Sequence, residues 1–286
     1  MKHKAMLLVA AFIANSYIAN SQATSSLLWE ISGNGLTQPS YLFGTVHMIP
    51  KKEFFFSDQM KAKFDACKAL ALEVDISSLS LSEKLEIAKQ SLLPEGQTLE
   101  NLLGPEKYTH FKTYLTDSLN IKEKRIAKYN RIKPFFVGGV VLKDYLGKIK
   151  AYEQEFLKYA KKNNMSVLGL ETVEDQMAII DQLNTQEQID LLQEEINMQD
   201  YLTLIELYKT QDIDSLYNWS MASGGNDEEM METMAFQRNQ KWIANIQKQI
   251  EINPTFIAVG AMHLPGEKGV INLLKKEGYT LTPVID

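Results

Sequence analysis

Short apolar runs alternate along this chain with longer stretches of helical periodicity, and this alternation constrains the fold more than any other feature. Six runs are rich in β-branched and aromatic residues, as strands are: LLWEISG, SYLFGTVHMI, ALALEVDI, MSVLGLET, TFIAVGAMH and YTLTPVI. Strands that alternate with helices predict an α/β fold. We expect a mixed central sheet flanked by helices, with helical insertions that form a cap.

The turn formers NGLTQPS separate the first two runs, which predicts a β-hairpin over 27–49. The first helical insertion is expected between Ser80 and Lys150, where Ser80 and Glu83 have the spacing of a capping box. The apolar segment KPFFVGGVVLKDYL, residues 133–146, is expected to pack under the sheet.

A second helical insertion is expected between Thr185 and Ile250. Thr185 and Gln188 again have capping-box spacing, and the pattern predicts one long helix over 185–219 and another over 226–250. No Ser/Gly/Pro-rich linker divides the chain, so we predict a single domain over 24–286.

Residues 1–23 have the layout of a cleaved secretory signal peptide. The basic stretch from Lys2 to Lys4 precedes the apolar run AMLLVAAFIA, and SQA, ending at Ala23, offers small residues to a signal peptidase. We predict a secreted or periplasmic protein. An uncleaved anchor is the alternative, but the apolar run is shorter than the about 20 residues that span a bilayer.

Composition narrows the class of partner. The content of 45% hydrophobic and 23% charged residues is that of a soluble globular protein. Removing residues 1–23 takes away two lysines and no acid, which changes the formal charge from −6 to −8 and disfavours nucleic acid. Cys67 is the only cysteine, so no internal disulfide forms, and we expect a small buried hydrophobic residue rather than a nucleophile.

Four acid or imidazole side chains share one predicted place in the fold. His47, Glu73, Glu171 and His263 each lie at or just beyond the C-terminal end of a predicted strand. Ligands of open α/β sheets bind at this edge. Two imidazoles with two carboxylates suit a first-row divalent ion such as zinc, cobalt, iron or manganese. A single histidine at a strand end is more often structural. Only the four side chains together indicate a site.

The two histidines belong to a repeated pattern, because FGTVH and VGAMH both end an apolar run with Gly-x-x-His. A glycine lets the backbone approach closely or bend at the strand end. The other histidines do not compete: His3 leaves with the signal, and His110 lies on a lysine-rich helix. The chain has no His-Glu-x-x-His helix, phosphate loop, Gly-x-Ser-x-Gly elbow or cysteine cluster.

Arg238, Asn239 and Trp242 lie on the polar helix FQRNQKWIANI. One interpretation is a solvated helix face with Trp242 packed inward. The other is a guanidinium fork that contacts a substrate carboxylate or a developing oxyanion.

The motifs together resemble the TraB/GumN family, which includes the Tiki metalloproteases. The pieces are YLFGTVH, ALALEVD, VLGLETVEDQ, QRNQKW and VGAMHLPGEKGVINLLKKEGY, in the family's order from LLWEISG to the C-terminus. The resemblance implies a metal-dependent peptidase with manganese or cobalt as the favoured metal. Tiki proteins remove amino-terminal residues of secreted signalling proteins, and other relatives are proposed to degrade or sequester peptide pheromones.

The resemblance also implies site residues. His47 and His263 match the motif histidines, Glu73 and Glu171 the strand-end glutamates, and the pair Arg238–Asn239 the family's Arg-Asn. The chain departs from the family at AYEQEF, where relatives often have Gly-x-Asp and this chain has Ala151 and Glu153. That position is therefore not taken as evidence for a site.

These roles give a scheme for peptide hydrolysis. The histidines and one carboxylate, for which we favour Glu171, hold the ion, and the other carboxylate, Glu73, takes a proton from the water. Arg238 stabilises the oxyanion or anchors the substrate. One alternative is a binding protein that sequesters a peptide or haem in the same crevice, and another is a partner surface without chemistry. The oligomeric state is not predicted.

Overall fold

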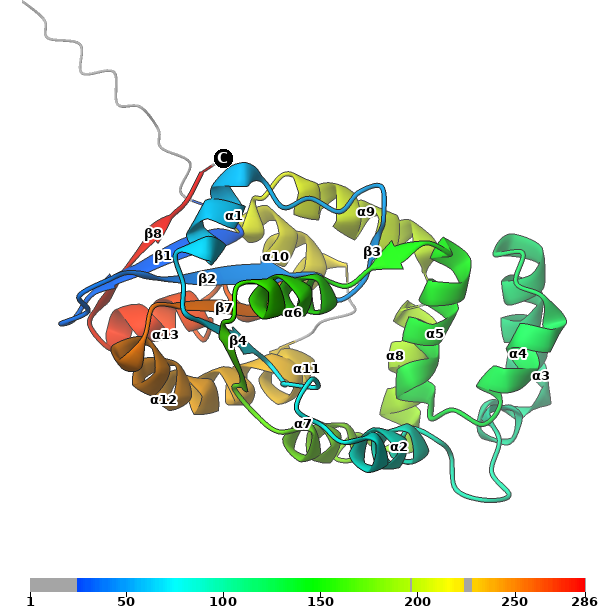
Figure 1. Cartoon of the computed structure of the whole chain (residues 1–286). Helices are drawn as coiled ribbons and strands as arrows, with labels where there is room; N and C mark the ends of the chain where they lie inside the picture. Colours follow the sequence, from blue (N-terminus) through cyan, green and yellow to red (C-terminus); the bar gives the residue numbers. More distant parts are fainter. Residues whose placement is uncertain (1–24, 196, 224–227, 286) are drawn as a thin grey trace, which may run out of the picture.

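A six-stranded mixed sheet forms the centre of the computed structural model, which describes residues 25–195, 197–223 and 228–285 (Figure 1). The predicted signal peptide and its cleavage site lie outside the described residues. The strand order is β6-β4-β7-β2-β1-β8. The bounds are β1 (Leu28–Gly33), β2 (Ser40–Thr45), β4 (Ala69–Leu72), β6 (Ser166–Gly169), β7 (Thr255–Gly260) and β8 (Tyr279–Pro283).

The four strands β6, β4, β7 and β2 run parallel to one another. β1 pairs antiparallel with β2, Leu28 opposite Phe43, which confirms the predicted hairpin, and β8 closes the other side of β1. The C-terminal ends of the four parallel strands therefore meet at one edge of the sheet.

Helices cover both faces of the sheet. One face packs on α1 (Asp58–Asp65) and α6 (Tyr152–Lys162), and the other on α12 (Gln237–Ile252) and α13 (Val270–Lys276). The strands are apolar on both sides for this reason: Phe43 joins the first core and its neighbour Leu42 the second. Cys67 lies in the first core at 3% exposure, as expected, and burial raises the pKa of its thiol to about 12.

The first insertion is a separate helical lobe at the right of Figure 1. Its core combines residues of α3 (Leu99–Thr113), α4 (Glu123–Tyr129), α5 (Pro134–Leu146) and α8 (Thr185–Glu195). The prediction that 133–146 packs under the sheet is wrong, because Val137 and Val141 of α5 are buried in this lobe beside Ile189. The capping box of Ser80 and Glu83 is confirmed at the start of α2 (Leu81–Gln90). A short ladder, β3 (Ile49–Pro50) with β5 (Ile149–Lys150), lies between the lobe and the sheet.

The second insertion does not contain the single helix expected over 185–219. It is divided into α8, α9 (Met198–Lys209) and α10 (Ile213–Ala222), because the side chains of Asn197 and Asp212 cap new N-termini. The capping residue of α8 is Asn184, paired with Glu187, and not the predicted Thr185 with Gln188. After α11 (Glu228–Met231), a π-helical turn (Glu232–Phe236) leads into α12.

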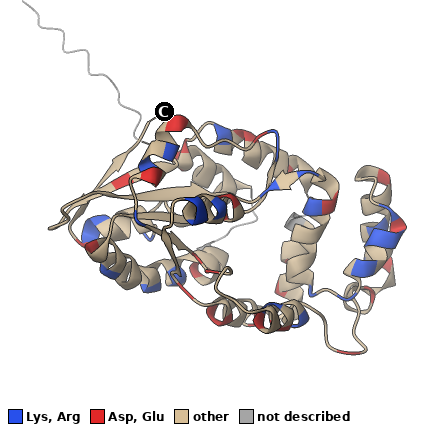
Figure 2. Ribbon diagram, viewed as in Figure 1, with Lys and Arg blue, Asp and Glu red and all other residues tan. Residues whose placement is uncertain are grey.

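Charged residues of both signs are interspersed over the helices and loops, both around the sheet and in the helical lobe (Figure 2). Within the described ranges, no helix is both long and apolar enough to cross a membrane.

Candidate active site

The sheet edge brings together the four side chains predicted to share it. His47 follows β2 by two residues, Glu73 follows β4 directly, and Glu171 follows β6 by two. His263 closes a 3₁₀ turn, Ala261–His263, that continues β7. These strands are neighbours in the sheet, so four residues far apart in sequence lie around one point.

Arg238 is the centre of a buried ion-pair network. Its side chain is 9% exposed, and its Nη2 lies 2.5 Å from Glu73 Oε2 and 2.5 Å from Glu171 Oε1. The Met234 carbonyl accepts a hydrogen bond from Nη1. One guanidinium thus compensates two buried carboxylates. Arg238 does not lie on a solvated helix face, and its partners are within the protein.

Glu171 has hydrogen-bond donors on both carboxylate oxygens. Oε1 accepts from Arg238 and from Gln176 Nε2 at 2.9 Å, and Oε2 accepts from Trp242 Nε1 at 3.1 Å. The Trp242 ring also lies 4.8 Å from the guanidinium carbon of Arg238. These contacts fix Glu171 and Arg238 against each other.

The two carboxylate oxygens of Glu73 have different partners. Oε2 is bonded to Arg238, while Oε1 accepts from the backbone N–H of Gly260 at 2.7 Å and lies 3.8 Å from His263 Nε2. Burial alone would raise the pKa of Glu73, but the facing His263, His47 and Arg238 lower it to about 2. The carboxylate is therefore ionised at neutral pH.

The orientation of His263 follows from the hydrogen bonds of Asn239. The Asn239 amide donates from Nδ2 to the carbonyls of His263 and Lys268, so its Oδ1 faces His263 Nδ1 at 2.6 Å as an acceptor. His263 Nδ1 must then carry the hydrogen, which leaves a lone pair on Nε2. Burial lowers the pKa of His263 to about 4, so the ring is neutral at pH 7.

Glu153 has the matching role at His47. Its Oε1 lies 3.3 Å from His47 Nδ1 and accepts from the Thr45 hydroxyl at 2.8 Å. The same carboxylate raises the pKa of His47 above its usual value. The His47 side chain is 70% exposed, so its Nε2 is accessible from outside the protein.

The side chains of His47, Glu73 and His263 converge over Gly260. A Cβ placed on Gly260 would lie 3.3 Å from Glu73 Oε1, 3.4 Å from His263 Cδ2 and 3.8 Å from His47 Nε2. Glycine leaves this space open. Gly44, in the other Gly-x-x-His motif, has a different reason: a Cβ there would lie 3.1 Å from the Cα of Ala261, so β2 could not approach the 3₁₀ turn as closely.

The donor set around Gly260 fits a divalent ion by its chemistry: two imidazole nitrogens and one ionised carboxylate oxygen. In both histidines an oxygen contacts Nδ1, from Glu153 at His47 and from Asn239 at His263, and such contacts are typical of metal-binding histidines. The side chains are not preassembled, because in the described part of the chain no three His, Cys, Asp or Glu side chains are close enough to hold an ion as they stand. Small side-chain movements would have to accompany binding.

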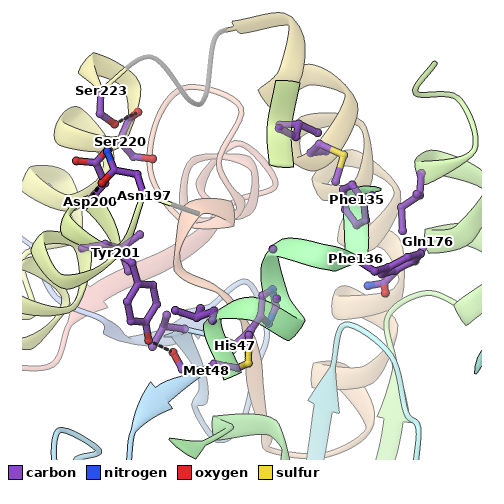
Figure 3. Close-up of a pocket in the computed structure, with 18 of the residues that line it drawn as sticks. His47, Met48, Phe135, Phe136, Gln176, Asn197, Asp200, Tyr201, Ser220 and Ser223 are labelled. Carbon is purple, nitrogen blue, oxygen red and sulfur yellow. Dashed lines mark hydrogen bonds between the residues drawn. The ribbon is translucent and has the colours of Figure 1, made fainter. Parts of the chain in front are cut away.

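A pocket of about 730 Å³ opens directly above this cluster, with His47, Glu73 and Arg238 among its lining residues. Figure 3 shows His47 and Met48 at its floor, Phe135, Phe136 and Gln176 on one side and Tyr201 on the other. Helices α5, α7 (Val173–Ile180) and α8 supply one wall, and α9 and α10 the other. The volume lies within the range of small-molecule and substrate sites.

Sequence reasoning missed two residues that contact this cluster. Glu153 is not predicted as a site residue because AYEQEF departs from the expected pattern and its partner His47 lies 106 positions away in the sequence. Gln176, which contacts both Glu73 and Glu171, is the last residue of the motif VLGLETVEDQ, but the sequence indicates no role for it because glutamines on helices are common.

Comparison with known families gives one match along almost the whole chain. The model of the TraB/PrgY/gumN family matches residues 27–283. No solved structure matches the chain significantly.

Curated relatives are similar at low identity. A Metalloprotease TIKI homolog from Amphimedon queenslandica is 22% identical over 96% of this chain and 64% of its own length. Metalloprotease TIKI1 is 24% identical in Danio rerio, over 89% of this chain and 62% of its own length, and 24% identical in Xenopus tropicalis, over 96% and 65%. The chain therefore spans less than two thirds of the length of these relatives.

Proposed function

The chain belongs to the TraB/PrgY/gumN family, and on this premise we propose that it is a metal-dependent peptidase acting at the strand-end cluster. The observation that carries the proposal is the convergence of His47 Nε2, Glu73 Oε1 and the His263 ring over Gly260, beneath a pocket of about 730 Å³. The names of the curated relatives support both the metal and the peptide substrate. We also propose manganese or cobalt as the ion, with zinc as a further candidate, and a secreted or periplasmic location.

His47 and His263 would hold the ion through Nε2. When bound, a divalent ion polarises a carbonyl and lowers the pKa of water towards about 7. Glu153 and Asn239 each contact Nδ1 of one ring, so that Nε2 is the nitrogen of each histidine that would bind the ion. Deprotonated His47 is required for this, so binding must displace the proton that Glu153 favours.

The two glutamates differ in their contacts. The sequence favoured Glu171 as ligand and Glu73 as base, and these roles stay predictions. We place Glu73 at the reacting centre, because its Oε1 is beside both imidazoles. Both oxygens of Glu171 already accept N–H donors, which supports a role in holding Arg238. Arg238, whose Nη1 lies 3.3 Å from His263 Nε2, would then stabilise a developing oxyanion.

The variants Glu73→Gln and Glu171→Gln separate these roles. We expect Glu171→Gln to retain the ion, measured by metal content after dialysis, with reduced turnover. Glu73→Gln should abolish turnover, and its metal content then identifies Glu73 as base if the ion stays and as ligand if it leaves. Loss of the ion only in Glu171→Gln, with a Glu73→Gln that keeps the ion but is inactive, would restore the assignment made from the sequence.

The peptidase itself is tested with a mixed peptide library. The purified protein is stripped with chelator, and cleavage is followed by mass spectrometry with and without manganese, cobalt or zinc. We expect metal-dependent products that are absent from His47→Ala and His263→Ala. The matched control is His110→Ala, because His110 is exposed on α3 in the helical lobe. Intact peptides under every metal, with the protein folded, would reject the proposal.

The binding alternative predicts a different result from the same protein. A haem or peptide carrier would use His47 and the pocket, but it would give the buried Glu73–Arg238–Glu171 network no task. A Soret shift on adding hemin, lost in His263→Ala and accompanied by no peptide cleavage, would favour that alternative.

A further inference from the structure

The walls of the pocket expose apolar side chains that the fold does not cover. Phe135 and Phe136 of α5 form an edge-to-face pair with ring centroids 5.2 Å apart, and both are only partly buried. On the same helix, Val137 and Val141 are fully buried in the lobe. α5 thus packs one apolar face and presents another to the pocket, which leaves apolar surface in water that a ligand could cover.

The charges of the lining also restrict the ligand. Arg238 is paired with Glu73 and Glu171, and Asp200 is the remaining acidic residue among the described residues that line the pocket, none of which is a lysine. Asp200 accepts a hydrogen bond from the Asn197 amide at 2.6 Å, on the opposite side of the pocket from Phe136 (Figure 3). Away from His47 and the proposed ion at the floor, an acidic side chain would meet the Asp200 carboxylate and no lysine or unpaired arginine among the described lining residues, so the walls of the pocket disfavour it.

Gly139 controls the space between α5 and the floor. A Cβ at Gly139 would meet only the Met48 Cε methyl, at 3.7 Å, which is an ordinary van der Waals contact. Packing therefore does not require glycine there, although glycine inside a helix costs about 0.5–1 kcal/mol relative to alanine. A need for open space beside Met48 and His47 accounts for this cost.

We propose that this pocket binds a large apolar side chain of the peptide, next to the bond that is cleaved, and that Gly139 sets the size it accepts. The inference rests on the proposed peptidase function, because cleavage at the His47 cluster places the neighbouring peptide residue in this pocket. It adds a substrate class: peptides with phenylalanine or a similar apolar residue beside the scissile bond, and not with an acidic residue there.

The test compares peptides that differ only in one residue beside the cleaved bond: phenylalanine, alanine or glutamate. With the native protein and the ion that supports cleavage, we expect kcat/KM for the phenylalanine peptide to exceed that for alanine by about 10- to 100-fold, and glutamate to be poorest. Gly139→Leu puts a bulky side chain into the pocket beside Met48 and should lower cleavage of the phenylalanine peptide at least tenfold more than that of the alanine peptide.

Two controls keep the result interpretable. Ala88→Leu adds the same kind of bulk on exposed α2, outside the pocket, and should leave the preference as in the native protein. Gly139→Ala adds one methyl group beside Met48 and should lower the preference for phenylalanine, but less than Gly139→Leu does. Equal kcat/KM for the three peptides, or an equal fall for all of them in Gly139→Leu, would overturn the pocket inference while the peptidase stands.

A binding measurement without metal separates this inference from the proposed function. Trp219 lines the pocket, so its fluorescence reports binding of the same peptides to the chelator-treated protein. Tighter binding of the phenylalanine peptide, lost in Gly139→Leu, would support the pocket even if no peptide is cleaved. Equal binding of all three peptides would overturn it.

Discussion

Both candidate ligand histidines are oriented through Nδ1, one by an amide and one by a carboxylate. Asn239 is buried and fixed by two backbone carbonyls, whereas Glu153 is only partly buried and also bonds Thr45. His47 is consequently the less constrained ring, and its orientation depends on one side chain. A substitution of Glu153 should therefore lower metal affinity more than it lowers the stability of the fold.

We expect Glu153→Ala to weaken metal affinity about 10- to 100-fold, because the loss of ring orientation outweighs the easier loss of the His47 proton that follows from removing the carboxylate. Titration with manganese or cobalt, followed by calorimetry, measures this. Glu155→Ala is the matched control: Glu155 lies on the same helix, but its partners are Lys150 and Lys158. Equal affinities for both variants would remove Glu153 from the site.

Single residues also show what the sequence could predict of the site. His47 and His263 could be found because a glycine at fixed spacing repeats in two strands, and strand ends have a known place in a parallel sheet. Glu153 could not be ranked, because its partner His47 lies 106 positions away and no local pattern links them. The Arg238 guanidinium faces two glutamates and not solvent. This orientation depends on tertiary packing alone, so the sequence could not predict it.

At the scale of elements, helix α2 differs from the other helices because none of its residues is buried. Isolated helices shorter than about 12–15 residues are marginal in water, and α2 has 10 residues. Its stability therefore depends on its cap, in which the Ser80 hydroxyl accepts from Glu83 N–H and the Glu83 carboxylate accepts from Ser80 N–H. Leu81 and Leu85 stay exposed at 75% and 56%.

Ser80→Ala should destabilise α2 by about 1 kcal/mol without changing global stability, because the cap is lost and no core contact is. Hydrogen exchange of α2 amides should accelerate about fivefold, while the midpoint of urea unfolding stays the same. Ser91→Ala is the matched control. It removes a hydroxyl that donates to the Ala88 carbonyl at the other end of the helix, so exchange of the first-turn amides should be unaffected. A lower global midpoint for Ser80→Ala would show that α2 is part of the cooperative core.

Element identity was easier to predict than element boundaries. The strands were recognisable because all of them are apolar on faces covered by helices. The region 185–219 was read as one helix because its apolar period continues across Asn197 and Asp212. Only the cap hydrogen bonds of these two side chains show the breaks, and asparagine or aspartate in a helix interior does not by itself predict them. The 133–146 segment was misplaced because an apolar helix fits the core of a lobe as well as the face of a sheet.

In the whole molecule, the site cannot persist without the sheet. His47, Glu73 and His263 follow β2, β4 and β7, three strands adjacent in the sheet, and Glu171 follows its edge strand β6. An ion held by these residues binds the folded state only, so its binding free energy adds to the free energy of unfolding. The helical lobe contributes no candidate ligand.

We expect manganese or cobalt at about 100 times its dissociation constant to stabilise the native protein by about 2.7 kcal/mol. For a chain of this size this corresponds to an increase in Tm of about 5–10 °C, measured by calorimetry against a chelator-treated sample. His47→Ala and His263→Ala should lose the increase, and His110→Ala should keep it. An unchanged Tm of the native protein at saturating concentrations of every ion tested would contradict a site at this edge, because an ion bound there must be released when the sheet unfolds.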